Sequence, residues 1–201
     1  MFVGERARLR GIERRDLPAI VRWLNDPAVR GRLGRGDPIS LVAEERWLET
    51  TLKSTTEVVF AIDAIADKDP FVGTCGLHAI DWRNRSARLG IMIGEAAWQG
   101  RGIGTEAVQL LVRHALRGLG LHRVELEVLT DNVPAIRCYE RVGFVSEGVR
   151  EGAIFLDGAF VDLRLMRVLS TAWPPPATPA ATTKRPTKKA TTTTRDASSG
   201  R

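Results

Sequence analysis

The chain has 201 residues, 43% of them hydrophobic, which is enough to bury a substantial core within one domain. It has no apolar run of about 18 residues, so no transmembrane helix is expected. The start, MFVGERARLR, lacks the apolar segment of a secretory signal. Cys75 and Cys138 are too few for a disulfide framework or a metal site, so we expect a cytoplasmic protein without a bound metal.

The net charge of +6 is concentrated at the C-terminal end of the sequence. Residues 174–201 carry +5 of it, through Lys184, Arg185, Lys188, Lys189, Arg195 and Arg201 against Asp196. Residues 1–173 are therefore nearly neutral, which weakens the case for a nucleic-acid-binding domain. We expect residues 1–173 to form one domain and the Pro-, Ala-, Thr- and Lys-rich remainder to be a disordered basic tail. The tail either aids solubility or makes a weak contact with nucleic acid or ribosomes.

Short strands and helices alternate along residues 1–173. In chain order we expect a strand over 7–12, a helix capped by Asp16 over 16–27, a helix over 42–53, strands over 58–65, 71–81 and 87–94, a long helix from about 104 to 118, a strand over 122–130, a helix over 132–143 that ends at Gly143, and two strands within 144–169 joined at Asp157-Gly158. The early strands are joined by turns too short for parallel crossovers. The fold class is therefore α/β (α+β), with a mixed, mostly antiparallel sheet.

The stretch Trp98–Thr105 reads WQGRGIGT and leads into the long helix. The first amides of a helix have no partner inside it, and the helix dipole adds partial positive charge at the same end. Glycines at 100, 102 and 104 remove the β-carbons that would keep an anion from those amides. The site suits a pyrophosphate, with Gln99 bracing the loop and Arg101 adding charge.

Two other interpretations fit this stretch. It could be a glycine-rich turn that binds nothing, or the G-x-G-x-x-A loop of a dinucleotide site, with Glu125 or Glu127 as the ribose-binding acid. Against a dinucleotide, several residues separate the preceding strand from the first glycine, and both acids lie inside a strand. Too little chain follows for further crossovers.

A second motif, beginning at Asn132, follows the glycine stretch. The spacing Q-x-x-G-x-G from Gln99 is followed by N-x-x-A-x-x-x-Y-x-x-x-G-F, present as Asn132, Ala135, Tyr139, Gly143 and Phe144. Together they resemble the GNAT superfamily of N-acetyltransferases, in the branch of ribosomal-protein N-terminal (alanine/serine) acetyltransferases and spermidine acetyltransferases. The likeness covers nearly all of residues 5–170.

The resemblance implies a twisted sheet that is splayed open between the strands over 87–94 and 122–130. It implies acetyl-CoA as cosubstrate, with its pantetheine arm in the opening and its pyrophosphate on the glycine loop. The implied cofactor-binding residues are Met92, Ile93, Gly94, Gln99, Gly100, Arg101, Gly102, Ile103, Gly104, Thr105, Asn132 and Ala135. A non-catalytic acyl-CoA-binding or sensing domain with the same fold is the alternative.

The resemblance makes Tyr139 the general acid that protonates the departing thiolate; otherwise it is a helix-face tyrosine packed on Phe144. Cys138 is read as a small buried thiol and Cys75 as a core residue. The base is unassigned: the branch often has Glu where this chain has Arg88, while His78 and Glu95 are weak candidates.

The resemblance implies a small amine or a protein N-terminus as the acceptor. A second copy of the chain, in a homodimer, is a further expected partner. In this branch the first two helices and the loop between them set acceptor specificity. Here the loop reads PAVRGRLGRGDPIS, with Arg30, Arg32 and Arg35 against Asp37. Such a loop would repel a polyamine and suits an acceptor with a carboxylate or phosphate, or an acidic protein N-terminus, unless it touches nothing.

Overall fold

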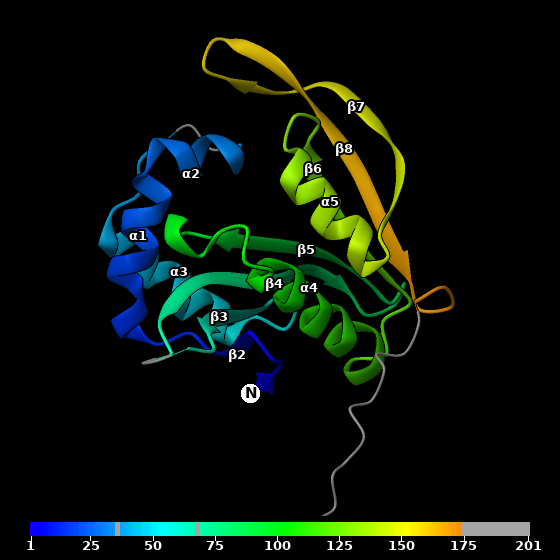
Figure 1. The fold of residues 1–201 in the computed structure, drawn as a ribbon, viewed down its shortest axis with the longest axis horizontal. Helices are drawn as coiled ribbons and strands as arrows, with labels where there is room; N and C mark the ends of the chain where they lie inside the picture. The colour runs from blue at the N-terminus through cyan, green and yellow to red at the C-terminus, as the bar shows by residue number, and fades with distance from the viewer. Residues whose placement is uncertain (35–36, 67–68, 174–201) are drawn as a thin grey trace, which may run out of the picture.

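The computed structural model describes residues 1–34, 37–66 and 69–173, and it is built on one eight-stranded sheet (Figure 1). The strands lie in the order β1-β2-β3-β4-β5-β6-β8-β7. All neighbouring strands are antiparallel except β5 and β6, which run parallel, so the expected mixed sheet is confirmed. The bounds are Phe2–Val3, Ala7–Gly11, Val58–Ala64, Phe71–Asp81, Ser86–Ile93, Arg123–Leu129, Val145–Leu156 and Ala159–Leu169 for β1 to β8. The expected tail, residues 174–201, lies outside the described residues.

Helices cover both faces of the sheet (Figure 1). They are α1 (Leu17–Asn25), α2 (Pro27–Arg32), α3 (Leu41–Lys53), α4 (Ile103–Arg113) and α5 (Val133–Val142). The larger apolar core lies between the sheet and α4 and α5, and a smaller one lies under α1 and α3. Successive side chains of a strand point to opposite faces, and β5 contributes Leu89 to the larger core and Met92 to the smaller one.

Two local features differ from the expected pattern. The loop expected after the first helix contains α2, which begins at Pro27 and is capped by Asp26, whose carboxylate accepts a hydrogen bond from the Ala28 amide (2.8 Å). The long helix expected to reach residue 118 is α-helical only to Arg113 and continues as a π-helical turn over His114–Gly118.

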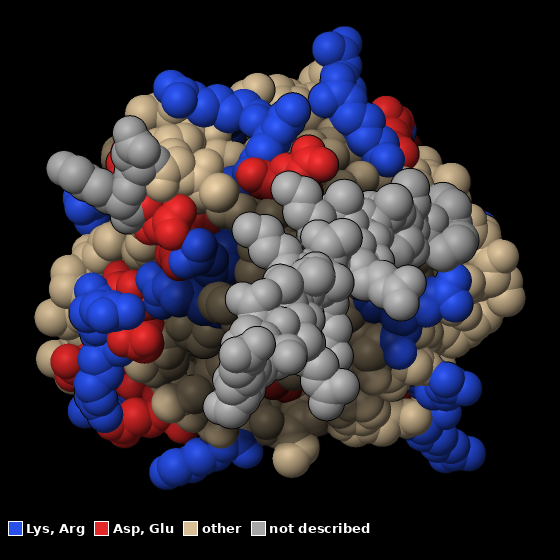
Figure 2. Space-filling view, turned by 60° about the horizontal axis from the view of Figure 1, so that its bottom comes forward, with Lys and Arg blue, Asp and Glu red and all other residues tan. Residues whose placement is uncertain are grey.

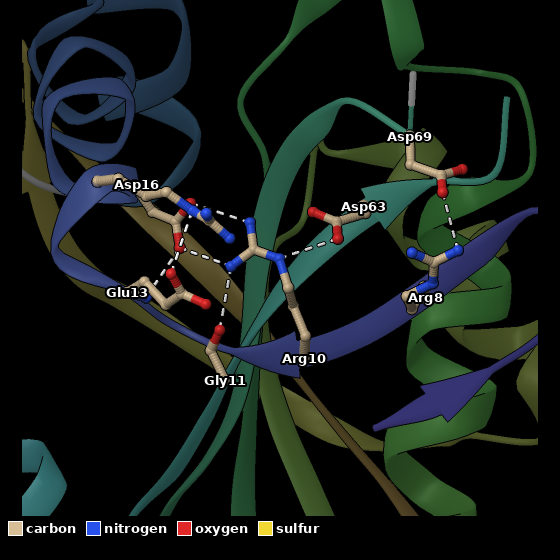
Figure 3. Close-up of polar contacts among 8 residues, drawn as sticks. Arg8, Arg10, Gly11, Glu13, Asp16, Asp63 and Asp69 are labelled. Atoms are coloured by element: carbon tan, nitrogen blue, oxygen red, sulfur yellow. Dashed lines mark hydrogen bonds and ion pairs between the residues drawn. The ribbon is translucent and has the colours of Figure 1, made fainter. Parts of the chain in front are cut away.

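The expectation that the Asp16 side chain caps the first helix is wrong, because this carboxylate has a different partner (Figure 3). Arg10 on β2 donates to both Asp16 oxygens (2.7 and 2.9 Å) and to Asp63 on β3 (2.9 Å). Asp16 is 4% exposed and Asp63 is 5% exposed, so the cluster is a largely buried ion-pair network. Burial alone would raise the pKa of Asp16, but the hydrogen bonds from Arg10 and the Glu13 amide lower it below its ordinary value. The cluster fixes the start of α1 against the sheet.

The surface of the described residues mixes charges of both signs. On the face seen in Figure 2, Lys and Arg side chains are interspersed with Asp and Glu side chains. This agrees with the near-neutral charge of residues 1–173. Within the described ranges, no helix has the length and apolar character that crossing a bilayer requires.

Candidate active site

An opening separates β5 from β6 along most of their length. The two strands pair only from Ser86 to Arg88 on β5, opposite Arg123 to Glu125 on β6. Beyond that point β5 continues to pair with β4 as far as Ile93, and β6 continues to pair with β8 as far as Leu129. Both strands therefore stay in the sheet while their facing edges separate, as the ribbon shows (Figure 1). Backbone groups on those facing edges need partners, which an extended ligand with amide groups supplies.

The glycine loop lies between the end of β5 and α4. Gly100 and Gly102 have φ angles of +73° and +83°, in the left-handed region that favours glycine. The first amide of α4 to pair with a backbone carbonyl is that of Glu106, which donates to Gly102 (3.1 Å). The amides before it, at 103–105, therefore begin the helix without an intrahelical acceptor. The arrangement fits an anion at this end of α4.

The two polar side chains predicted to support the loop do so in different ways. The Gln99 side-chain amide donates to the Ile93 carbonyl (2.9 Å) and thereby ties the loop to the end of β5. The Arg101 guanidinium lies over the Trp98 ring, 4.9 Å from its centroid. At the end of β5, the Gly94 amide donates to Val72 (2.9 Å). The Ile93 carbonyl and the Gly94 amide, both in the predicted cofactor-binding set, thus already have partners within the chain.

Arg6 and Glu106 were not predicted for this region. A β-carbon placed on Gly102 would lie 2.6 Å from Arg6 Nη1, so this guanidinium rests directly against the loop. The Glu106 carboxylate, in the first turn of α4, accepts hydrogen bonds from the amides of Glu5, Arg6 and Ala7 (2.8, 2.7 and 2.6 Å). No local pattern reveals such a contact, because about a hundred residues separate the partners in sequence.

Helix α5 forms the other side of the opening. Asn132 caps it by accepting a hydrogen bond from the Ala135 amide (3.3 Å), and Gly143 ends it with a φ of +106°. The Thr105 hydroxyl of α4 donates to the Cys138 sulfur of α5 (3.4 Å). Burial raises the pKa of the Cys138 thiol, so the thiolate needed for a nucleophile is disfavoured. The helix that carries Tyr139 is thus joined to the helix that follows the glycine loop.

Tyr139 is 8% exposed, and its ring centroid lies 5.8 Å from that of Phe144. Burial raises its pKa above the ordinary value of a phenol. The side chain therefore keeps its proton at neutral pH, as a general acid must. Its packing on Phe144 is equally what a structural tyrosine would show, so its role stays a prediction.

A cavity of about 430 Å³ opens on the side of the sheet covered by α1 and α3. Its lining is mostly apolar and includes Ile20, Leu24, Leu33, Ile39 and Trp47, so Trp47 is a cavity residue as well as a core residue. Three ionisable side chains, those of Glu44, Cys75 and His78, line the same cavity, and burial raises the pKa of the Cys75 thiol, which favours its neutral form. Of the three expected loop arginines, Arg30 and Arg32 lie on α2, whereas Arg35 lies outside the described residues.

The base candidate Glu95 and Arg88, which stands where the branch often has Glu, both have partners within the chain. Glu95 contacts the Arg22 guanidinium and accepts a hydrogen bond from the Trp23 indole (3.0 Å). Arg88 lies 3.9 Å from Glu127 across the start of the opening. In the described part of the chain, no group of three or more His, Cys, Asp and Glu side chains is arranged to hold a metal ion.

Comparison with known proteins decides the family. The Acetyltransferase (GNAT) domain matches residues 6–145. The chain belongs to this family. The dinucleotide interpretation is therefore wrong. The side chains of Glu125 and Glu127 instead form ion pairs with Arg123 (2.8 Å) and Arg150 (3.0 Å) on the strands of the sheet.

Relatives within the GNAT family differ in what their names say they acetylate. The uncharacterized N-acetyltransferase p20 of Bacillus licheniformis is 28% identical over 170 residues, covering 82% of this chain and 93% of the relative. The ribosomal-protein-serine acetyltransferase of Escherichia coli is 31% identical over 50% of this chain and 56% of the relative. The crystal structure of spermidine N-acetyltransferase from Vibrio cholerae with CoA and spermine superposes with a TM-score of 0.79 at 25% identity, covering 84% of this chain and 98% of the other.

The protein is thus a GNAT N-acetyltransferase, an acyltransferase of a family that uses acetyl-CoA. The residues present fit that donor. The facing edges of β5 and β6 offer unpaired backbone groups to pantetheine amides, and the start of α4 offers amides to a diphosphate. The cavity of about 430 Å³ lies on the side of the sheet under α1 and α3 and includes Met92 of the predicted cofactor-binding set in its lining.

Gly104→Asp is expected to weaken acetyl-CoA binding without destabilising the fold. A β-carbon at position 104 meets only Ile93 Cγ1, at an ordinary 3.6 Å, and an acidic residue in the first turn of a helix stabilises it by about 0.3–1 kcal/mol. The same charge repels a diphosphate, so the Kd measured by calorimetry should rise about tenfold or more. Gly104→Ala adds the β-carbon without the charge, so it measures the steric effect alone and should weaken binding less than Gly104→Asp does. Equal affinities for the two variants would contradict an anion site here.

Proposed function

We propose that the enzyme transfers the acetyl group of acetyl-CoA to a primary amine by direct attack, with Tyr139 as the general acid. The observation that carries this proposal is the opening between β5 and β6, because it has the glycine loop at one end and the helix of Tyr139 along its side. Acetyl-CoA supplies the activated acyl group. The chain's own residues hold the donor, position the amine and move protons.

The division of roles follows from the chemistry at each position. The residues Gln99 to Thr105 hold the diphosphate, and the β5 edge at 92–94, with Asn132 and Ala135 on the far side, lines the pantetheine arm. Tyr139, protonated at neutral pH, donates to the sulfur as the thiolate departs. A main-chain amide on the open edge of β5 is the kind of donor that stabilises the oxyanion.

The acceptor site proposed is the cavity under α1 and α3. Its apolar lining favours an amine attached to an apolar body, either a small molecule or the first residues of a protein. Arg30 and Arg32 on the neighbouring α2 disfavour a second positive charge and favour a carboxylate or phosphate on the acceptor. These features support a monoamine or a protein N-terminus over spermidine, despite the relatives that act on spermidine.

The proposal is tested by an acceptor panel. Purified enzyme and acetyl-CoA are mixed with amino acids, aminoglycosides, spermidine, an alkylamine and short peptides with free N-termini, and CoA release is followed with a thiol reagent. At least one monoamine or peptide should raise CoA release well above the rate without acceptor, and spermidine should do so less. Tight CoA binding without transfer to any acceptor would favour the non-catalytic alternative.

A further inference from the structure

We propose that His78, oriented by Glu57, is the catalytic base that removes a proton from the acceptor amine. This inference rests on the proposed function and assigns the residue that its chemistry leaves open. Three observations carry it: the place of the ring on the sheet, the carboxylate behind it, and the backbone that aims it.

The His78 ring lies where the opening begins. Pairing between β5 and β6 ends at Arg88, and Gly90 is the next residue of β5 on the same face. A β-carbon on Gly90 would lie 3.4 Å from His78 Nε2, and one on its cross-strand partner Gly76 would lie 3.2 Å from the same atom. The ring therefore rests over two glycines, and His78, Gly76 and Gly90 all line the acceptor cavity. An amine in the cavity that approaches the opening passes this nitrogen.

The other ring nitrogen faces a held carboxylate. His78 Nδ1 lies 3.6 Å from Glu57 Oε1, and the second Glu57 oxygen accepts a hydrogen bond from the Thr51 hydroxyl of α3 (3.3 Å). The Nδ1–Oε1 distance is longer than a hydrogen bond, as is common in free enzymes before the substrate tightens the site. A carboxylate at Nδ1 favours the neutral tautomer that carries its proton there, and this leaves the Nε2 lone pair directed over the glycines.

The backbone next to His78 departs from regular strand geometry. The register between β4 and β5 shifts between His78 and Asp81, and Ala79 has a φ of +48°, in the left-handed region. Such bulges redirect neighbouring side chains and are enriched beside active sites. The irregular backbone at Ala79 therefore helps to set the direction of the neighbouring His78 side chain.

Charged groups from three elements lie beside His78 or line the cavity that it lines. Glu57 precedes β3, Glu44 of α3 lines the same cavity, and Arg88 is the cross-strand partner on β5. Arg88 is itself within 3.9 Å of Glu127.

His78, Tyr139 and solvent account for every proton that moves during acetyl transfer. His78 Nε2 takes one proton from the ammonium form of the acceptor and passes it to solvent. The neutral nitrogen then adds to the thioester carbonyl and forms the N–C bond, which moves the carbonyl electron pair onto oxygen. When this oxyanion re-forms the carbonyl, the C–S bond breaks and Tyr139 gives its proton to the sulfur. The second amine proton leaves the new amide nitrogen and restores Tyr139, so the products are the acetamide, CoA thiol and one free proton.

The kinetic test is His78→Gln, with an alkylamine that the wild-type enzyme acetylates as acceptor. At pH 7 its kcat/KM for the amine should fall about 100-fold or more, while the Kd for acetyl-CoA measured by calorimetry is unchanged. The deficit should shrink as the pH approaches the pKa of the amine, near about 10.4, because the amine then arrives neutral without a base. His122→Gln is the matched control, since that ring bonds to Ser170 (3.1 Å), outside the cavity lining, and it should match wild type.

A second readout does not depend on turnover. In ¹⁵N-labelled free enzyme, NMR should find neutral His78 with its proton on Nδ1, and Glu57→Gln should shift the population toward the Nε2 form. The same variant should lower kcat/KM about tenfold, since the imidazole then spends less time in the tautomer that presents the Nε2 lone pair. These two measurements decide the matter if His78→Gln fails to fold.

The outcomes separate the two proposals. An active wild type whose His78→Gln variant keeps its kcat/KM at every pH overturns the base assignment alone, as does an Nε2–H tautomer in the free enzyme. A wild type that transfers to no amine in the panel overturns the proposed function, and the base assignment with it.

Discussion

Replacing Tyr139 with phenylalanine is expected to lower kcat about 100-fold or more, because the departing thiolate then has no positioned proton donor. The change removes one hydroxyl and keeps the ring against Phe144, so the melting temperature should stay close to wild type. The measurement is steady-state CoA release with the best acceptor of the panel, together with the Kd for acetyl-CoA. A kcat equal to that of the wild type in the folded variant would show that Tyr139 is a packing residue and not the general acid.

The pH dependence of the wild type provides a further check on Tyr139. Its pKa is raised by burial, so the phenol stays protonated well into the alkaline range. A general acid is active in its protonated form, and kcat should therefore show no loss between neutral pH and about pH 10, the ordinary pKa of tyrosine. A fall in kcat below that pH would mean that the acid is another group.

Arg10→Gln is expected to destabilise the fold by about 3–5 kcal/mol, because it leaves two buried carboxylates without their cation. Arg10 joins β2, β3 and the start of α1 through Asp63 and Asp16, with hydrogen bonds of 2.7–2.9 Å. The matched control is Arg14→Gln, which breaks the exposed pair with Glu49 and should cost at most about 1 kcal/mol. Urea denaturation at pH 7 measures both, and similar losses would show that the cluster adds nothing beyond a surface ion pair.

The same cluster predicts how acid affects stability. The folded pKa of Asp16 is lower than its unfolded value, so its contribution is fully present above about pH 3.9 and is lost as the pH falls through the folded pKa. The free energy of unfolding should therefore decrease below about pH 4 in the wild type. This acid-dependent part should be smaller in Arg10→Gln, since that variant lacks the cation that lowers the pKa.

The sequence predicted the features that depend on local patterns. The strands over 71–81 and 87–94, the turn pair Asp157-Gly158 and a glycine loop leading into a helix were all predicted from local sequence, and the structure contains them. The left-handed backbone of Gly100 and Gly102 is known only from the structure. The position of the opening was predicted only from the family resemblance, because no local sequence pattern indicates where two parallel strands stop pairing. The helix α2 was missed although Asp26 and Pro27 form a helix start, since the arginines and glycines around it were read as a loop.

Contacts between segments that are distant in sequence could not be predicted from local patterns. Asp16 was expected to cap a helix because Asp is common at that position, but Arg10 and the Glu13 amide bind its carboxylate instead. The approach of Arg6 to Gly102 depends on how β2 lies against α4. In the same way, nothing in the local sequence links His78, a weak candidate, to Glu57, which lies about twenty positions earlier and carries no motif.

The order of the two binding regions along the chain has an evolutionary consequence. The residues that line the cavity all lie between Ile20 and Met92, whereas the glycine loop, α4 and Tyr139 all follow Ile93. A single recombination event near Gly94 would therefore exchange the whole cavity lining, together with the β5 edge at Met92 and Ile93, and leave the glycine loop, α4 and Tyr139 intact. In such a chimera the new N-terminal block would bring its own amine preference to an unchanged diphosphate loop and an unchanged Tyr139, so relatives could diversify in what they modify while conserving how they hold the diphosphate.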